Sequence, residues 1–433
     1  MSTWPHALSP FLWGVASSAH QVEGHQPGND WSRWEETGHT RDLSNDRVDH
    51  WTRYREDVAL YRKMGANASR ISLEWSRLEP EPGRWDDDAF EHYADMLNAT
   101  RAQGLEPLVT LSHFTLPLFV ADAGGWLWEG MEDAFLRFTE RVVQRFSHVK
   151  LWCTINEPTV LPLMGYEEGV WPPGQRSLRV GLRVLGREIA IHHRAYRLIK
   201  SIDPTALVGL AHHVVRFRPL ANTPAHRALA AFLHRTFNAW TIDHTREAQD
   251  YIGLNYYSCR WATLRRPVNP YASRRGVPVT QMGWEIDPEG LFDLAVWAKR
   301  YARPILITEN GIATDDEDER ARYIADHVAA LRRAAAQGAD VRGYFYWSGL
   351  DNFEWAEGYR PHFGLAAVAP DGTRTLKAGA AALKAEAEAG FYGTEGLRDL
   401  ESPKAAVTVS VSGARGPASS GAPFESRHDT DRA

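Results

Sequence analysis

Cysteine is scarce in this chain of 433 residues, which contains only Cys153 and Cys259. Two cysteines are too few for a disulfide framework, and the zinc-site spacings, H-E-x-x-H or Cys-rich, do not occur. Each cysteine lies within an apolar run, where a buried free thiol is expected. The sequence therefore argues against a disulfide-stabilised fold and predicts no metal site and no cofactor.

Long basic segments and long apolar segments are also missing. The net charge is −6 and no block of Lys and Arg occurs, so the basic footprint of a nucleic-acid-binding protein is absent. No apolar run is long enough to span a bilayer, and the opening "MSTWPHALSPFLWG" lacks the basic and apolar regions of a secretory signal. We expect a cytoplasmic protein without nucleic-acid or membrane partners. The sequence carries no signal for an oligomeric state.

Tryptophan, by contrast, is abundant. The chain contains 17 Trp, while its hydrophobic fraction of 43% and charged fraction of 24% are ordinary for a globular protein. Aromatic rings in such number can form core, and they also suit the apolar faces of sugar rings.

Strand-like runs recur along the chain at intervals of about forty to fifty residues. The eight runs are "FLWGVAS", "ASRISLEW", "EPLVTLSHF", "KLWCTINEP", "ALVGLAHHVV", "YIGLNYYS", "PILITENG" and "VRGYFYWSG". Alternation of such strands with helices predicts an α/β fold, and eight parallel strands can close into a (β/α)8 TIM barrel without exposed edges. We expect a single catalytic domain over residues 1–390. Residues 391–433 are rich in Ser, Ala, Gly and Pro, which predicts a low-complexity, disordered tail.

Helical patterns lie between several of these strands. Examples are "WTRYREDVALYRKMG", "DAFLRFTERVVQRFS" and "DERARYIADHVAALRRAAAQG", the last of which ends at a glycine suited to the position after a helix. The acidic run "DDEDER" at residues 315–320 favours a solvated loop and a helix start over a metal site, because acidic residues stabilise helix N-termini.

Two of the strand-like runs end on a glutamate. "LWCTINEP" delivers Glu157 and "PILITENG" delivers Glu309, from the fourth and seventh runs. In a (β/α)8 barrel the reactive groups lie at the C-terminal ends of the strands, so both carboxylates can face one mouth. Either glutamate alone could instead serve a helix start or an ion pair.

Enzymes that cleave glycosidic bonds commonly use a pair of carboxyl groups on either side of a cleft. One carboxyl group protonates the leaving oxygen, and the other meets the positive charge that develops on the sugar. A separation of roughly 5–5.5 Å gives a nucleophile and retention, whereas roughly 6.5–9.5 Å admits a water and gives inversion. The pair therefore points to a glycosidase.

With these residues the chain resembles glycoside hydrolase family 1, the retaining β-glycosidases. "TINEP" is similar to the acid/base motif of the family and "ITENG" to its nucleophile motif. The resemblance covers about residues 9–385 and includes, in order, "FLWGVASSAHQVEG", "SRISLEWSRLEPEPG", "LSHFTLPLFVADAGGW", "YIGLNYYS", "GWEIDPEGL" and "YFYWSGLDNFEWAEGYRPHFGL".

The resemblance implies Glu157 as acid/base and Glu309 as nucleophile, supported by Arg70 and Tyr257. Arg70 could otherwise be a buried ion-pair residue, and Tyr257 an ordinary aromatic barrel residue. The chemistry asks for unequal pKa values: the pKa of Glu157 raised by a dry setting and a negative neighbour, and Glu309 held ionised by its partners.

The resemblance also implies a set of sugar-binding residues. By position these are Gln21, His113, Asn156, Glu354 and Trp355 for the hydroxyls and Trp347 for stacking under the ring, with Trp126 and Trp171 possible at the leaving-group side. Core packing is the alternative role for the tryptophans. The carboxylate expected at Glu354 would repel a phosphate, which favours a non-phosphorylated sugar.

Two departures from the family pattern bear on substrate preference. The usual His-Trp-Asp-Leu-Pro of the third strand reads "HFTLP" here, so Phe114 lacks an indole N–H. The segment from Pro219 to Tyr251 is shorter than usual. The resemblance also implies that the residue at Glu354 accepts either hydroxyl configuration at the fourth carbon, so a β-glucosidase is favoured and galactose and fucose stay open as glycones.

The sequence as a whole predicts a retaining exo-β-glycosidase acting on a small-molecule β-glycoside or oligosaccharide. A transglycosidase with the same carboxylate pair is an alternative. A metal-dependent barrel hydrolase is another, suggested by 18 His and the doublets His192-His193 and His212-His213. Adjacent residues of a strand point to opposite faces, so most of these histidines are expected to be structural or exposed.

Overall fold

The structure of the chain is a computed structural model that describes residues 4–5, 8–25, 28–44, 46–264 and 276–392. Eight parallel strands form a closed barrel in which each strand pairs with its sequence neighbours and β1 pairs with β8. The strands are β1 (Leu12–Ala16), β2 (Ala68–Ser72), β3 (Glu106–Ser112), β4 (Leu151–Asn156), β5 (Leu207–Pro219), β6 (Ile252–Ala262), β7 (Ile305–Asn310) and β8 (Val341–Trp347). The predicted (β/α)8 barrel is thus confirmed.

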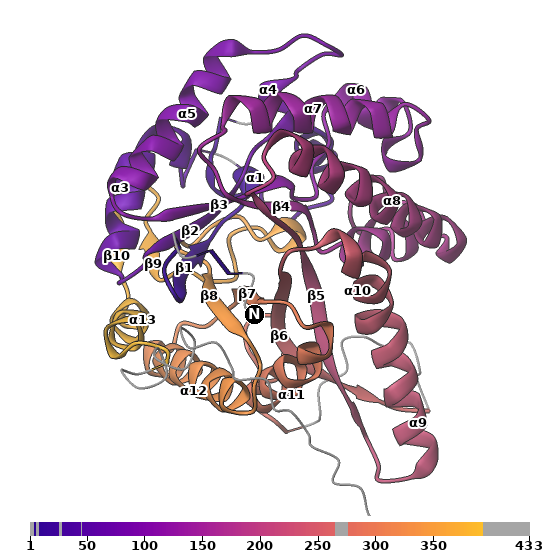
Figure 1. Cartoon of the computed structure of the whole chain (residues 1–433), viewed down its shortest axis with the longest axis vertical. Coiled ribbons are helices and arrows are strands. Elements are labelled where there is room, and N and C mark those ends of the chain that lie inside the picture. The colour runs from indigo at the N-terminus through magenta and orange to yellow at the C-terminus, as the bar shows by residue number, and fades with distance from the viewer. Residues whose placement is uncertain (1–3, 6–7, 26–27, 45, 265–275, 393–433) are drawn as a thin grey trace, which may run out of the picture.

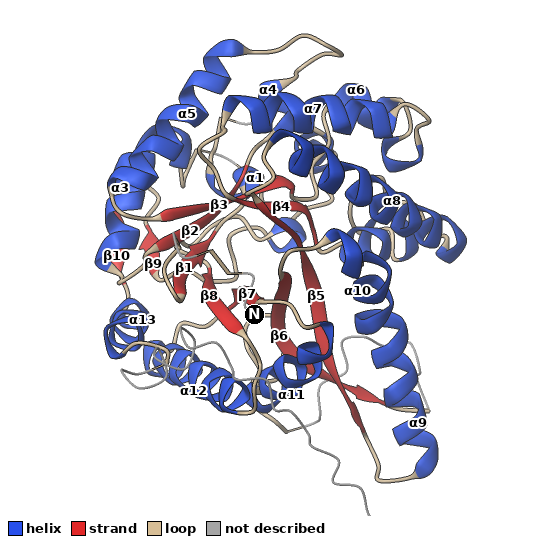
Figure 2. Ribbon diagram, viewed as in Figure 1, coloured by secondary structure: helices blue, strands red, loops and turns tan. Residues whose placement is uncertain are grey.

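Helices surround the barrel (Figure 1; Figure 2). The longer ones are α3 (His50–Lys63), α5 (Asp87–Ala102), α7 (Met131–Arg145), α8 (Leu178–Ile202), α9 (Pro224–Leu233), α11 (Pro288–Ala298), α12 (Glu317–Ala336) and α13 (Ala378–Ala389). Shorter ones are α1 (Ala19–Val22), α2 (Asp30–Glu36), α4 (Trp75–Leu78), α6 (Leu118–Asp122) and α10 (Trp240–Thr245), with single turns η1 (Gly125–Leu127), η2 (Pro162–Glu167), η3 (His234–Ala239), η4 (Arg246–Ala248), η5 (Lys299–Tyr301) and η6 (Trp355–Glu357). A hairpin of β9 (Ala366–Val368) and β10 (Arg374–Leu376) lies outside the barrel.

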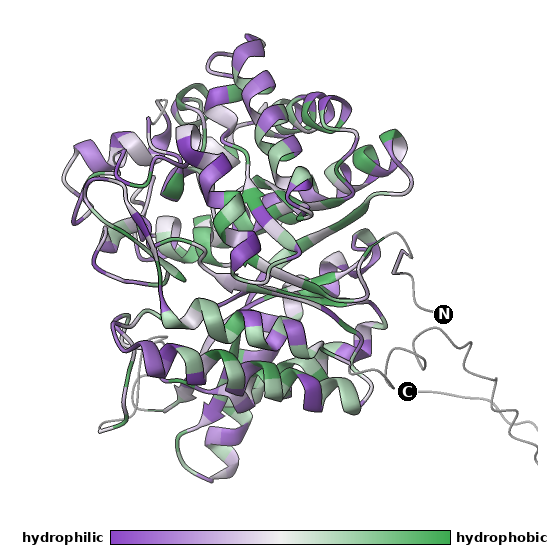
Figure 3. Cartoon of the chain, turned by 90° about the vertical axis from the view of Figure 1, so that its left-hand side faces the viewer, coloured by the Kyte–Doolittle hydropathy of each residue, from purple (hydrophilic) through white to green (hydrophobic). Residues whose placement is uncertain are grey.

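The core consists of two main clusters and a small third one formed by Val215, Phe217, Ala230 and Ala262. Leu12, Leu108, Leu151, Cys153 and Leu306 belong to a cluster formed largely by inward-facing strand residues, and a larger cluster fills the space between strands and helices. Strands buried on both faces read as nearly continuous hydrophobic runs, as "ILIT" does at the start of β7. The outer helices carry both hydrophilic and hydrophobic segments (Figure 3), because one face packs on this core and the other meets water.

Local sequence signals set several boundaries. Helix α12 begins within the acidic run: the Asp316 side chain accepts a hydrogen bond from the backbone N–H of Glu319, and Gly338 follows the helix with a φ of 86°. The predicted helix start is therefore confirmed. Both cysteines are buried free thiols, also as predicted.

The end of the described chain lies close to its beginning. Phe391 is buried, and its ring stacks on that of Phe11 with centroids 4.1 Å apart. The described packing thus continues to residue 392, two residues past the predicted boundary. The tail predicted beyond it lies, from residue 393 on, outside the described residues. Among the described residues, no helix is both long and apolar enough to cross a membrane.

Strands β5 and β6 are longer than the others. Their pairing continues from Arg216 opposite Cys259 to Pro219 opposite Ala262, past the level at which β4 and β7 end. Figure 1 shows β5 running out of the barrel beside α9. This two-stranded projection forms one wall of the barrel mouth.

Candidate active site

A cavity with a volume of about 760 Å³ lies at the C-terminal ends of the strands. Asn156 and Glu157 at the end of β4, Tyr257 in β6, Glu309 in β7 and Trp347 in β8 all line it. The two strand-end glutamates singled out from the sequence therefore face a single cavity. This is the end of a (β/α)8 barrel where reactive groups are expected.

Glu309 is held by a cation and a hydroxyl. The Arg70 guanidinium, fully buried on β2, donates from Nη1 to Oε1, and the Tyr257 hydroxyl donates to Oε2 at 2.5 Å. Both supporting residues expected from the family resemblance thus contact the predicted carboxylate. Arg70 also donates from Nη2 to Asn156 Oδ1 at 2.7 Å, which ties β2 to β4.

The residues after Glu309 explain the "ENG" ending of its strand. Asn310 points away from the cavity: its amide donates to Tyr256 O at 2.6 Å and to the Tyr323 hydroxyl at 2.8 Å. A Cβ at Gly311 would lie 1.8 Å from Trp347 O, so no other residue fits without displacing the backbone. These two residues fix the strand end, and the carboxylate before them is fixed with it.

Glu157 is held in a different way. Its backbone has a φ of 45°, in the left-handed region that non-glycine residues rarely adopt, so the chain turns sharply as it leaves β4. Asn255 Nδ2 donates to Glu157 Oε1 at 3.0 Å and to Asn156 Oδ1 at 3.2 Å, while His213 Nδ1 lies 3.1 Å from the same Glu157 oxygen. Strained backbone of this kind gathers at functional sites.

Asn255 and His213 were not identified from the sequence as site residues. Most of the histidines were expected to be structural or exposed, and His213 differs because it contacts Glu157 and lines the cavity. His212 does bond away from the site, to Gln249 Oε1 at 3.0 Å, as the alternation of a strand requires. Position was the usable signal: Leu151 and Leu207 begin β4 and β5 and pair with each other, and Glu157 and His213 each lie six residues further along.

Burial raises the pKa of Glu309 to about 7, and the nearby Glu157 carboxylate adds to this, although Arg70 and the Tyr257 hydroxyl act in the opposite direction. The expectation that its partners hold Glu309 ionised needs this correction, because burial has a larger effect on the pKa than these partners do. A negative charge beside a buried carboxyl group favours the protonated form of that group.

The pKa of Glu354 is also raised. Burial and the Glu309 carboxylate raise the pKa of Glu354 to about 8, so this group is largely neutral at pH 7. The predicted repulsion of a sugar phosphate by Glu354 therefore loses much of its force. A phosphorylated sugar is disfavoured more strongly by the lack of cations. Arg260 is the single Arg or Lys among the described residues that line the cavity, so a phosphate would find little positive charge.

The remaining predicted sugar-binding residues fall into two groups. His113, Trp347 and Trp355 line the cavity, and Asn156 Nδ2 lies 3.2 Å from His113 Nε2. Burial, reinforced by Arg70, lowers the pKa of His113 well below its usual value, so the ring is neutral. Gln21 lies behind this surface, where its Nε2 donates to Phe353 O at 2.8 Å and to Glu354 Oε2 at 3.3 Å.

The two tryptophans predicted near the leaving-group side differ. Trp171 lines the cavity and packs against Phe114, with ring centroids 5.0 Å apart. Trp126 does not line it; only 1% exposed, it packs in the core against Phe135. The structure therefore brings Trp171 to the site and leaves Trp126 outside it.

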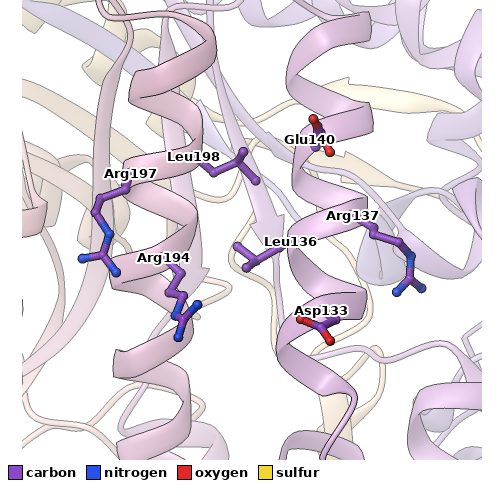
Figure 4. Close-up of a pocket in the computed structure, with 7 residues that line it drawn as sticks. All are labelled: Asp133, Leu136, Arg137, Glu140, Arg194, Arg197 and Leu198. Atoms are coloured by element: carbon purple, nitrogen blue, oxygen red, sulfur yellow. The ribbon is translucent and has the colours of Figure 1, made fainter.

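A second hollow, of about 460 Å³, lies on the outside of the barrel between α7 and α8 (Figure 4). It is lined by Asp133, Leu136, Arg137, Glu140, Arg194, Arg197 and Leu198. Arg137 and Arg194 form ion pairs with Glu79 and Glu132. This hollow has no pair of buried carboxylates and is a surface groove between two helices. Among the described residues, no group of three or more His, Cys, Asp or Glu side chains is arranged to hold a metal ion.

Comparison with known proteins agrees with this geometry. The family model described as glycosyl hydrolase family 1 matches residues 6–251 and 235–388. Beta-glucosidase A of Thermotoga maritima is 31% identical over 411 residues, which cover 83% of this chain and 92% of that protein. The structure of a beta-glycosidase from Pyrococcus horikoshii superposes with a TM-score of 0.81 at 34% identity, covering 89% and 94% of the two chains.

A structure of the beta-glucosidase from Thermotoga maritima in complex with glucoimidazole is also similar, with a TM-score of 0.80 at 29% identity, covering 87% and 97% of the two chains. The matched family extends over the whole barrel and includes both strand-end glutamates. The chain belongs to glycosyl hydrolase family 1 and is a glycoside hydrolase.

Proposed function

We propose that the protein is a retaining exo-β-glycosidase that removes one non-phosphorylated sugar from a β-glycoside. The observation that carries the proposal is a chain of hydrogen bonds joining the two carboxylates around one cavity. Arg70 donates to Glu309 and to Asn156, and Asn255 donates to Asn156 and to Glu157. This network fixes both carboxylates relative to a sugar bound between them.

In the first step Glu309 attacks the anomeric carbon while Glu157 gives its proton to the glycosidic oxygen. The bond between the anomeric carbon and that oxygen breaks, a bond to a Glu309 oxygen forms, and the leaving group departs as an alcohol. This step needs one ionised and one protonated carboxyl group, and the two glutamates have different partners: a guanidinium and a phenol for Glu309, an amide and an imidazole for Glu157.

In the second step a water molecule attacks the anomeric carbon. Glu157 takes the proton of the water, the bond to Glu309 breaks, and the sugar leaves with its original anomeric configuration. Esterification removes the charge of Glu309, which makes Glu157 the only carboxylate of the pair and therefore a competent base. Arg70 and Tyr257 receive the carboxylate as it is released.

Glucose is the proposed glycone, with galactose and fucose as further candidates. The relatives that support this choice are named beta-glucosidase and, for a protein of Pyrococcus woesei, beta-galactosidase. His113 and Glu354 lie on the cavity wall where ring hydroxyls need partners. A neutral Glu354 can donate as well as accept a hydrogen bond, which suits hydroxyl groups of either configuration.

The test is a panel of 4-nitrophenyl β-glucoside, β-galactoside and β-fucoside, with the first-formed sugar observed by NMR. We expect turnover of at least one member and initial release of the β-anomer. Initial release of the α-anomer would rule out retention, and failure to cleave any member of a panel extended to other β-glycosides would rule out the activity.

A further inference from the structure

The catalytic cavity continues outward from Glu157 between walls of hydrophobic side chains. We name this outer part the apolar trough and define it by Leu163, Leu178, Leu182, Val215, Phe217 and Phe237, all of which line the cavity. They come from η2, α8, β5 and η3, segments that are separate in sequence and meet only at this side of the barrel mouth.

One wall leads from the catalytic group along β5. His213, Val215 and Phe217 are alternate residues of the strand, and all three line the cavity. His213 Nδ1 lies 3.1 Å from Glu157, and the ring of Phe237 lies 5.9 Å from those of both His213 and Phe217. The wall is therefore continuous from Glu157 to the projecting end of β5.

The other wall is formed by the first turns of α8. Leu178, Leu182 and Leu185 follow the spacing i, i+4, i+7, so they share one face of the helix, and all line the cavity. Leu178 is 60% exposed and Leu182 is 56% exposed. Large aliphatic side chains gathered on an exposed face beside a cleft are characteristic of a binding surface.

The position of the trough identifies which part of a substrate would enter it. Under the proposed function, on which this inference depends, Glu157 protonates the leaving oxygen, so the leaving group extends past Glu157 and along His213. A second sugar there would need partners for several hydroxyl groups. The trough offers it mainly leucine, valine and phenylalanine side chains. Besides Glu157, Glu309 and Glu354, the charged residues that line the cavity are Glu167, Glu168, Arg260 and Glu357.

We propose that the apolar trough binds an aliphatic chain, and that the substrates of this enzyme are β-glycosides whose aglycone is a long alkyl or acyl-bearing group. Burial of each methylene between the two walls stabilises the bound state. Because this contact is made with the aglycone, it contributes to the first step and is lost when the leaving group departs.

The experiment uses n-alkyl β-glycosides of the best accepted sugar, from methyl to octyl, below their micelle concentrations. We expect kcat/KM to rise about fourfold for each methylene fully enclosed by the trough. In parallel, the alkyl 1-thio-β-glycosides, which resist cleavage, are titrated calorimetrically. Their Kd should fall along the same series and their binding heat capacity should become more negative, because apolar surface is buried.

The decisive variant is Leu182→Asp, which places a charge in the trough at an exposed position. The ratio of octyl to methyl kcat/KM should fall at least tenfold. The matched control is Leu376→Asp, since Leu376 is an exposed leucine on β10, outside the cavity; its ratio should equal that of the wild type.

Three outcomes would overturn the proposal. One is a flat chain-length series in both kcat/KM and thioglycoside Kd; another is a Leu182→Asp ratio equal to the control. The third is a preference for cellobiose over the octyl glycoside that Leu182→Asp leaves unchanged. The thioglycoside titration does not require turnover, so it reports on the trough even where the proposed hydrolysis fails.

Discussion

The ends of β7 and β4 present the same side chain in two different settings. Glu309 continues a strand and receives a guanidinium and a phenol, whereas Glu157 lies on a strained turn and is held by an amide and an imidazole. A permanent cation therefore contacts one carboxylate, while an amide and an imidazole contact the other. This difference in partners supports the proposed division of two chemically identical groups into a nucleophile and an acid/base.

The largest effect is expected from removing the carboxylate at the end of β7. Glu309→Gly should lower kcat by ~10⁵–10⁶-fold, the scale of losing a covalent nucleophile. Azide fits the space left by the side chain and attacks the same face of the sugar. Activity on an activated aryl glycoside should therefore return with azide, and NMR should identify an α-glycosyl azide.

Glu188→Gln is the control for that experiment. Glu188 is a buried carboxyl group on α8 that does not line the cavity, and burial raises its pKa well above the usual value, so a neutral amide replaces a neutral acid. Its kcat should stay near that of the wild type. A β-glycosyl azide from Glu309→Gly would reverse the assignment of the two glutamates.

Removing the carboxylate at the end of β4 should have a smaller effect that depends on the substrate. Glu157→Ala should lower kcat/KM by about 10²–10⁴-fold for alkyl glycosides, which need a proton on the leaving oxygen. Dinitrophenyl glycosides, whose leaving group needs no proton, should still glycosylate the enzyme rapidly in a stopped-flow measurement. Equal slowing across all leaving groups would contradict the acid role.

Loss of the phenol that contacts Glu309 should change the pH dependence of kcat/KM. The Tyr257 hydroxyl stabilises the ionised form of Glu309, so Tyr257→Phe should raise the pKa of Glu309 further above about 7. Attack needs ionised Glu309, so the acidic limb of the kcat/KM profile should move to higher pH. Near pH 7 the rate should fall about ten- to a hundredfold, as expected for losing a hydrogen bond to a charged group.

If the acidic limb of the kcat/KM profile of Tyr257→Phe matched that of the wild type, Tyr257 would only pack against the site. Tyr256→Phe serves as the control, because its hydroxyl donates to Asp287 O and does not contact either glutamate.

The barrel and its catalytic pair were predictable because they depend on periodicity and on strand ends. An apolar run such as "ILIT" indicates a strand buried on both faces, and the residue that closes it must lie at the mouth. Glu157 and Glu309 could therefore be placed at the mouth without coordinates, whereas Arg70 and Tyr257 were expected only from the family resemblance.

The partners of Glu157 were not predictable in the same way. His213 and Asn255 reach it from β5 and β6, and the registers of β5 and β6, and of β6 and β7, shift near these residues. A pattern of alternation gives the face of a residue but not how far its strand is displaced along the barrel. The pKa of Glu309 likewise depends on how completely water is excluded, which is a property of the assembled cavity.

The smallest effect on activity is expected where the sequence suggested a binding tryptophan and the structure shows a core one. Trp126→Phe should leave kcat/KM within about twofold for aryl and alkyl glycosides, because the ring lies outside the cavity. It should still lower the free energy of unfolding by about 1–3 kcal/mol, a typical cost of a core substitution, seen as a lower melting midpoint.

Trp171→Phe is the matched variant. Its ring lines the cavity beside Phe114, so kcat/KM should change with the leaving group. If Trp126→Phe instead altered leaving-group preference as Trp171→Phe does, Trp126 would have to act on the aglycone through the loop that carries it, and the division between core and cavity drawn at this wall would be wrong.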